Sequence, residues 1–207
     1  MRQRVNKTTQ PIRSQSDRNA IDAYLMHKNP RDRVMFALGI YTGRRISDLV
    51  KLDFRDVAYI DHKGHIRISE RLAIYEQKTG KFVDIALHPN LIRILRKYQR
   101  QRRKYSESLG ALLNEPLLKS RKARSDGQFR ITRRHALRVL ADAAHACGLN
   151  YKIGTHSLRK TFGYTLYQKG VSIELIQQML NHSSPEITLS YIGITRDDMD
   201  EAILSLD

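Results

Sequence analysis

The chain has 207 residues, of which 41% are hydrophobic, and its 37 Lys and Arg residues against 21 Asp and Glu residues give a formal net charge of +16. That length allows one domain, or at most two small ones, with a real core. The single cysteine, Cys147, excludes an internal disulfide and a zinc site built from cysteines. The positive charge is spread over the whole chain and favours a polyanionic partner, with nucleic acid ahead of an anionic membrane surface or an RNA scaffold.

The N-terminal part of the chain is predicted to be helical after a short basic arm. Residues 1–15 are polar and basic, so we expect a flexible arm that touches phosphates. Ser14 or Ser16 can cap a first helix, which should end near Pro30. Apolar residues at helical spacing then predict a second helix, followed by a third across 44–52. No apolar run approaches the roughly 20 residues that a membrane-spanning helix needs.

Between Val57 and Leu87 the pattern changes from helical spacing to alternation. Gly64 separates two short extended pieces, and the run from Lys78 to Lys81 is typical of a tight turn between two further strands. These pieces predict one small antiparallel sheet in an otherwise helical protein. The expected fold class is therefore α+β, mainly α.

Helical patterns dominate the C-terminal half. They are interrupted at 106–130, where we expect a loop with a short strand at Leu117-Leu118. The first helix of this half has basic residues around its outer face, which is typical of a solvated surface as much as of a binding surface. Helices are predicted at 90–104, at 132–147, from Gly154 to Lys169, at 172–180, from Pro185 through Tyr191, and at 196–206.

Five short elements follow one another along the chain: Thr42-Gly43-Arg44-Arg45, Lys78 on its turn, His156-x-x-Arg159, Leu180-Asn181-His182-Ser183-Ser184, and Tyr191. Each is weak by itself, since most such residues lie on solvated surfaces or pack in cores. Their order resembles the tyrosine recombinase (phage integrase) family, whose pattern is Thr-Gly-x-Arg, a hairpin Lys, His-x-x-Arg, Leu-Gly-His and a nucleophilic Tyr. The resemblance runs from about residue 16 to the C-terminus. It implies the catalytic-domain fold of that family, the DNA breaking-rejoining enzyme type.

The chemistry of phosphodiester cleavage explains why arginines belong in such a site. The reacting phosphate is already an anion, so a catalyst without a metal must neutralise it with fixed cations and hydrogen-bond donors. His156 and Arg159 are three residues apart at the start of a predicted helix, so they share one face beside the positive end of the helix dipole. Arg45 and Arg159 can each present a planar fork to the phosphate oxygens.

The remaining residues supply a nucleophile and proton transfers. Tyr191 is the expected nucleophile, because its phosphate ester keeps the energy of the broken bond. His156 and His182 can donate to phosphate oxygens, and His156 could accept the tyrosine proton. Lys78 is expected to protonate the departing 5′ oxygen, and Asp48 to support Arg45. The resemblance implies a 3′-phosphotyrosine intermediate, with no metal, ATP or other cofactor.

Two departures from the family pattern stand out. Asn181 replaces the usual glycine, and asparagine tolerates left-handed backbone nearly as well. Family members usually also have an N-terminal core-binding domain that closes around DNA. Here only the arm of residues 1–15 precedes the expected catalytic domain at 16–207, so we expect either a catalytic fragment or a small recombinase that holds DNA from one side. An accessory DNA-binding or clamp protein would then complete the grip.

The expected partner is double-stranded DNA, with the protein in the cytoplasm and associated with the nucleoid. The helix at 196–206 could assemble a homo-oligomer, a tetramer on DNA, or pack within its own chain. Two rival functions remain open: a type IB topoisomerase-like enzyme that nicks and reseals one duplex, and a non-catalytic basic DNA-binding protein of the same fold. Candidate DNA-contacting residues are Arg44, Arg100, Arg103, Lys104, Lys122, Arg124, Arg133 and Arg134.

Overall fold

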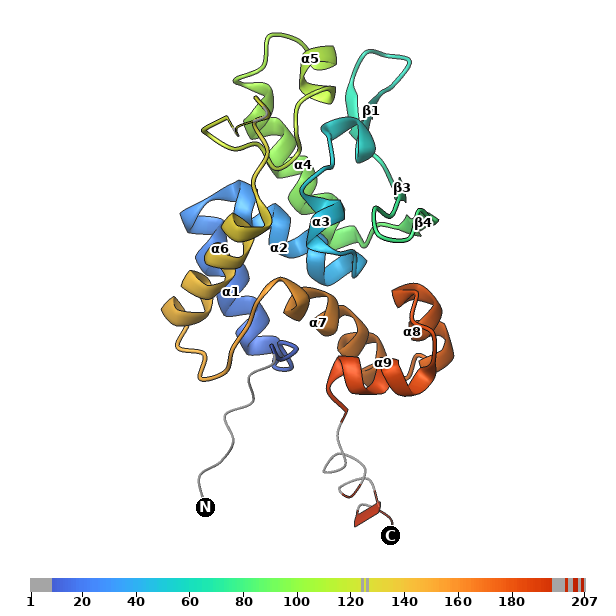
Figure 1. Ribbon diagram of the computed structural model, residues 1–207. Helices are drawn as coiled ribbons and strands as arrows, with labels where there is room; N and C mark the ends of the chain where they lie inside the picture. Colours follow the sequence, from blue (N-terminus) through green and yellow to red (C-terminus); the bar gives the residue numbers. More distant parts are fainter. Residues whose placement is uncertain are drawn as a thin grey trace.

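A computed structural model describes residues 9–123, 125, 127–194, 200, 203, 204 and 206. Its helices are α1 (Gln15–Lys28), α2 (Pro30–Thr42), α3 (Ile46–Leu49), the 3₁₀ helix η1 (Phe54–Asp56), α4 (Pro89–Arg103), α5 (Leu109–Leu113), α6 (Arg133–Ala146), α7 (Thr155–Gln168), α8 (Ile173–Leu180) and α9 (Pro185–Ile192). Its strands are β1 (Ala58–Ile60), β2 (Ile66–Ile68), β3 (Arg71–Tyr75) and β4 (Phe82–Ala86). The expected class, mainly helical with a small antiparallel β part, is confirmed (Figure 1).

The helix boundaries follow from capping side chains that the sequence places at each start. Ser14 accepts a hydrogen bond from the Asp17 backbone N–H and so begins α1. Asn29 ends α1 and caps α2 in the same way, with Pro30 at the first helical position. These caps satisfy N–H groups that have no partner within the helix.

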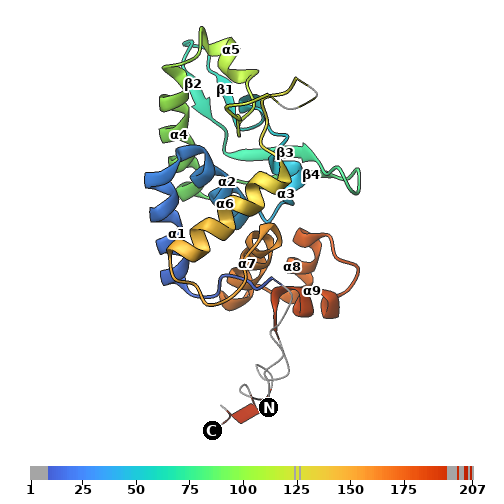
Figure 2. The same cartoon turned by 60° about the vertical axis from the view of Figure 1, so that its left-hand side comes forward.

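The β part differs from the single sheet that was expected. β1 pairs with β2 and β3 pairs with β4, both antiparallel, but β2 and β3 do not pair with each other. Only Ser69 and Glu70 separate β2 from β3, and the chain does not reverse there as it must to pair them. The result is two separate hairpins, of which β3–β4 projects from the body of the molecule (Figure 2).

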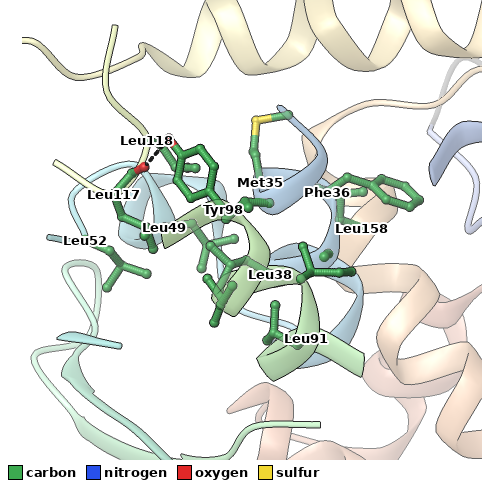
Figure 3. Packing of buried hydrophobic residues seen from close by; sticks show 14 of the residues in the cluster. Met35, Phe36, Leu38, Leu49, Leu52, Leu91, Tyr98, Leu117, Leu118 and Leu158 are labelled. Carbon is green, nitrogen blue, oxygen red and sulfur yellow. Dashed lines mark hydrogen bonds between the residues drawn. The ribbon is translucent and has the colours of Figure 1, made fainter. Parts of the chain in front are cut away.

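The main hydrophobic core lies around α2. Leu38 on α2 and Leu91 on α4 have no exposed surface, and neither has Leu117. Figure 3 shows these residues packed together, with the Tyr98 hydroxyl donating to the Leu117 carbonyl oxygen at 3.0 Å. The 106–130 region is therefore tied to the core. Leu117-Leu118 belongs to no strand, contrary to expectation, and the short helix α5 was not predicted.

Two further expectations need correction. The third helix is four residues long rather than nine, because the backbone at Arg45 is extended and the helix ends at Leu49. The arm was expected to be flexible through residue 15, but Ile12 is fully buried, and its backbone N–H donates to Thr161 Oγ1 at 2.8 Å. Residues 1–8 lie outside the described part of the chain, and so does most of the helix expected at 196–206.

A second, smaller cluster joins α8 and α9 to α7. Its buried members are Phe162, Ile176, Leu180 and Ile192. Gly163 permits this contact, because a Cβ atom there would lie 2.7 Å from Ile192 Cγ2. Both views show α8 and α9 beside α7, at the end of the molecule away from α5 (Figures 1 and 2). Within the described residues, no helix is both long and apolar enough to cross a membrane.

Candidate active site

The candidate nucleophile, Tyr191, lies on α9 and faces α7. Its hydroxyl is 3.5 Å from His156 Nδ1, and its ring meets the edge of the His182 ring at a centroid distance of 4.8 Å. Lys160 Nζ lies 5.4 Å from the centre of the Tyr191 ring. Ser184 and Pro185 begin α9 as predicted, since Ser184 Oγ accepts from the Ile187 backbone N–H.

The protonation of this tyrosine depends on its surroundings. Burial raises the pKa of Tyr191, while the charges of Arg159 and Arg45 and a hydrogen bond from Arg159 oppose the rise. The phenol is therefore neutral near pH 7 and must lose its proton to an acceptor before it can attack. Burial lowers the pKa of His156, and the charges of Arg133, Lys160, Arg159 and Arg45 lower it further. A neutral His156 can serve as that acceptor.

Arg159 is almost fully buried at the start of α7, where it bridges two parts of the chain. It donates to the Gly43 carbonyl oxygen at 2.8 Å and to the Leu180 carbonyl oxygen at the end of α8. Gly43 has a left-handed backbone, with φ of 63°, and a Cβ atom there would meet the Phe162 ring at 2.4 Å. Glycine at this position thus lets the turn after α2 approach α7 closely enough to bind Arg159.

Arg45 and its neighbour Arg44 both contact Glu76 but differ in how deeply they are buried. Arg45 stands at the start of α3 with its side chain 20% exposed, and it contacts Glu76. Arg44 was expected to face DNA, and that expectation is wrong: its side chain is 2% exposed and bonds Glu76, Thr42 O and Met179 O.

Glu76 is a site residue that the sequence did not predict. It follows β3 directly and is buried, with Oε1 3.0 Å from Arg44 Nη1 and Oε2 2.9 Å from Arg45 Nη1. A signal was present, because Leu72 and Ile74 point inward on the same strand and the alternation turns Glu76 inward too. Asp48 does not hold Arg45 as expected; it accepts the Gln77 backbone N–H at 3.1 Å and so holds the hairpin.

The orientation of His182 is set by a residue that was not predicted. The Thr188 hydroxyl donates to Ser184 O at 3.1 Å and therefore accepts from His182 Nδ1, also 3.1 Å away. The other ring nitrogen of neutral His182, Nε2, then carries no proton. Burial lowers the pKa of His182 to about 4, with Arg159 and Arg45 adding to the effect. His182 is therefore neutral near pH 7 and becomes a donor through Nε2 only when it is protonated.

The hairpin carries two lysines near this cluster. Lys78 lies in the exposed turn, two residues after Glu76. Lys81 Nζ donates to Asn181 Oδ1 at 2.7 Å and so links the hairpin to the turn before His182. Asn181 has a left-handed φ of 49°, as its place in the Leu-Gly-His pattern predicted.

The other basic candidates lie at different distances from the cluster. Arg133 is exposed at the start of α6, close enough to lower the pKa of His156. Arg134 and Lys122 are also exposed, and Arg124 lies outside the described residues. Three more, on or just after α4, are exposed on an element at the opposite edge of the molecule from the hairpin in Figure 2, namely Arg100, Arg103 and Lys104.

The sequence model of the phage integrase family matches residues 8–197. The chain belongs to the phage integrase family. A probable integrase/recombinase of Bacillus subtilis, YoeC, is 40% identical over 188 residues, which cover 91% of each chain. The resemblance inferred from the five elements is thereby confirmed.

Solved structures show the same fold. XerA recombinase superimposes with a TM-score of 0.68 at 20% identity, over 95% of this chain and 65% of its own. A lambda integrase tetramer bound to a Holliday junction gives 0.61 at 19% identity, over 90% of this chain and 49% of its own. The expected tyrosine recombinase catalytic-domain fold is confirmed. The chain spans about half the length of several other tyrosine recombinases that it matches.

Proposed function

We propose that this phage integrase family member is a site-specific DNA recombinase that cleaves and rejoins strands through a 3′-phosphotyrosine on Tyr191. The observation that supports it most is the neutral Tyr191 phenol 3.5 Å from His156 Nδ1, in the field of Arg159 and Arg45. A phenol that lies close to both a proton acceptor and guanidinium groups suits attack on an anionic phosphate. The reaction needs neither a metal nor a nucleotide.

The proposed step balances without a further reactant. Tyr191 Oη forms a bond to phosphorus as the bond from phosphorus to the 5′ oxygen breaks. The phenol proton passes to His156 Nδ1, and Lys78 protonates the departing 5′ oxygen. Arg45 and Arg159 neutralise the non-bridging oxygens in the transition state. The reverse reaction, with a 5′ hydroxyl from a partner strand, rejoins the DNA and releases the tyrosine.

His182 also acts in this step, as a hydrogen-bond donor to the phosphate. Its Nε2 would gain a proton when the negative charge of the phosphate offsets the charges of Arg159 and Arg45, which help to lower its pKa. The protonated ring could then donate to a phosphate oxygen. Nε2 is the nitrogen that can take up this proton, because Nδ1 is already bonded to Thr188.

The proposed partner is double-stranded DNA, and the proposed assembly is a homotetramer through residues 196–206. The lambda integrase structure, a tetramer on a Holliday junction, supports the tetramer by analogy but says nothing of the segment that would form it. Three described residues near the C-terminus expose large apolar side chains, which suits a contact with another surface: Ile203, Leu204 and Leu206. An accessory DNA-binding or clamp protein and a nucleoid-associated location in the cytoplasm belong to the same proposal.

Covalent trapping tests this function directly. The protein is incubated without metal on nicked duplexes that carry candidate target sites, denatured, and examined for a protein–DNA adduct. We expect an adduct with the wild type and none with Tyr191→Phe, because phenylalanine has no oxygen to attack phosphorus.

The matched control is Tyr167→Phe, which removes the hydroxyl of a partly exposed tyrosine on α7. Its adduct yield should equal that of the wild type. An adduct that persists in Tyr191→Phe would refute the assignment of the nucleophile. Relaxation of supercoiled plasmid without strand exchange between two target sites would favour the topoisomerase-like rival.

A further inference from the structure

A single buried carboxylate organises the arginines of the candidate site. Glu76 has no exposed side-chain surface, and both of its oxygens are occupied. Oε1 accepts from Arg44 Nη1 at 3.0 Å and lies 3.9 Å from Arg159 Nη1. Oε2 accepts from Arg45 Nη1 at 2.9 Å and from Thr79 Oγ1 at 2.9 Å. Three guanidinium groups therefore converge on one acid.

Such a cluster cannot form without a counter-charge. Burial lowers the pKa of both Arg44 and Arg159, and the charge of Arg45 lowers them further. Buried cations cost free energy unless they are paired, and these three repel one another. Burial acts to raise the pKa of Glu76, but the hydrogen bond from Thr79 and the charges of Arg45 and Arg44 outweigh it, so the carboxylate stays ionised.

The balance of charge also leaves the cluster able to bind an anion. One carboxylate against three guanidinium groups leaves an excess of positive charge. Among the described residues, the Arg45 side chain hydrogen-bonds only Glu76, through Nη1. The rest of this partly exposed guanidinium is left for a phosphate oxygen.

We propose that Glu76 is a positioning residue for the phosphate-binding arginines, above all Arg45. The proposal rests on the proposed function in one respect, that Arg45 meets the scissile phosphate. Glu76 acts through Arg45 and does not touch the DNA. Glu76 also accepts a hydrogen bond from Thr79, in the turn that carries Lys78. One residue therefore fixes the positions of both the turn and the arginines.

The test compares two substrates that differ only in charge at the scissile phosphate. One is the nicked phosphodiester duplex. The other carries a neutral methylphosphonate in place of the scissile phosphate, so an arginine has less negative charge to neutralise. Glu76→Gln keeps the shape of the side chain and removes its charge. We expect adduct formation on the phosphodiester to fall about 100-fold, as a misplacement of about 1 Å can cause. On the methylphosphonate the fall should be less than about tenfold.

Asp84→Asn is the matched control, because Asp84 lies on the same hairpin and pairs with Arg71 at the surface. Its rates should equal those of the wild type on both substrates. If Glu76→Gln only reduced the amount of folded protein, the rates on both substrates would fall by the same factor. Either that equal fall or an unchanged rate on the phosphodiester would overturn the proposal. If thermal unfolding shows that Glu76→Gln does not fold, Glu76→Asp replaces it. That variant keeps the charge but is one methylene too short to bridge Arg44 and Arg45, and the same contrast is expected.

A measurement without DNA separates this proposal from the proposed function. In ¹⁵N NMR of the arginine side chains, assigned with Arg44→Lys and Arg45→Lys, the Arg45 signal should be shifted from those of solvated arginines. In the Glu76 variant it should move to the solvated position. A wild type without a Tyr191-dependent adduct would refute the function, whereas an Arg45 signal unmoved by the Glu76 variant would refute the positioning role.

Discussion

The two halves of the candidate site are held in different ways. Arg45 and the first turn of α7 adjoin α2, which is buried along most of its length in the main core. His182 and Tyr191 lie around α8 and α9, where the second cluster has four buried side chains. Polar contacts at the end of α8 supplement this small cluster, from Arg159 to Leu180 O and from Arg44 to Met179 O. We therefore expect the side that carries Arg45 and Arg159 to be rigid, and the side that carries Tyr191 to open at a lower free energy.

Arg159 and Arg45 differ in what they hold together in the structure. Arg159 faces the candidate nucleophile and at the same time fastens α8 to the turn after α2. Arg45 makes no such link, since its contact is with Glu76. Replacing either arginine should therefore slow DNA cleavage, but only the replacement of Arg159 should loosen the attachment of α8.

The largest expected effect comes from Arg159→Ala. Adduct formation should fall by about 100- to 1000-fold or more, the usual consequence of removing one fixed donor to a developing anion. Amide hydrogen exchange in α8 and α9 should also accelerate, because two carbonyl contacts are lost. Arg45→Ala should lower the rate by a similar factor and leave exchange in α8 unchanged. Equal exchange in the two variants would show that Arg159 does not fasten α8.

The next contrast uses buried apolar side chains in the two clusters. Leu38 and Ile192 are both fully buried. Leu38→Ala should lower the free energy of unfolding of the whole domain by about 2–5 kcal/mol. Ile192→Ala should instead accelerate exchange mainly in α8 and α9, with a smaller shift of the global transition. If exchange accelerated equally throughout the domain in both variants, the two regions would unfold as one unit.

The stability of the α8–α9 region should depend on pH through His182. In the folded state His182 has a pKa of about 4, below its ordinary value of 6.5, so it stays neutral while the opened form takes up a proton. Its stabilising contribution is complete above pH 6.5 and is lost as the pH falls toward 4. Protection in α8 and α9, corrected for intrinsic exchange, should therefore fall between pH 7 and pH 5. The loss of protection should be smaller in His182→Gln. An identical loss in that variant would show that other groups cause the pH dependence.

The smallest expected effect concerns the basic surface. Arg133→Gln, close to His156, should reduce the slope of log affinity for DNA against log salt by about 1 if one phosphate contact is lost. Replacing Arg100, Arg103 and Lys104 with glutamine should change that slope less per residue, because α4 lies away from the hairpin. Fluorescence anisotropy over a salt series measures both. A larger change per residue for the α4 variant would place DNA along that helix.

Much of the molecule could be predicted from the sequence because local chemistry decides it. Ser14 and Ser184 cap helices that begin at the next residue, as the sequence indicated. The left-handed turn at Asn181 followed from the tolerance of asparagine for that conformation. The order of the short motifs was enough to identify the family, since spacing along a chain is visible without contacts. These features depend on near neighbours in the chain.

The tertiary structure decided what the buried charges do. Arg44 and Arg45 are adjacent and identical in type, yet only the fold turns one into the core and leaves the other partly exposed. Glu76 directly follows a strand, and only the fold brings three arginines from two separate segments to it. Glu76, and not Asp48, bonds Arg45, because the fold brings Glu76 to that arginine. Which charges meet depends on contacts between residues far apart in the chain, and burial then makes those pairings obligatory.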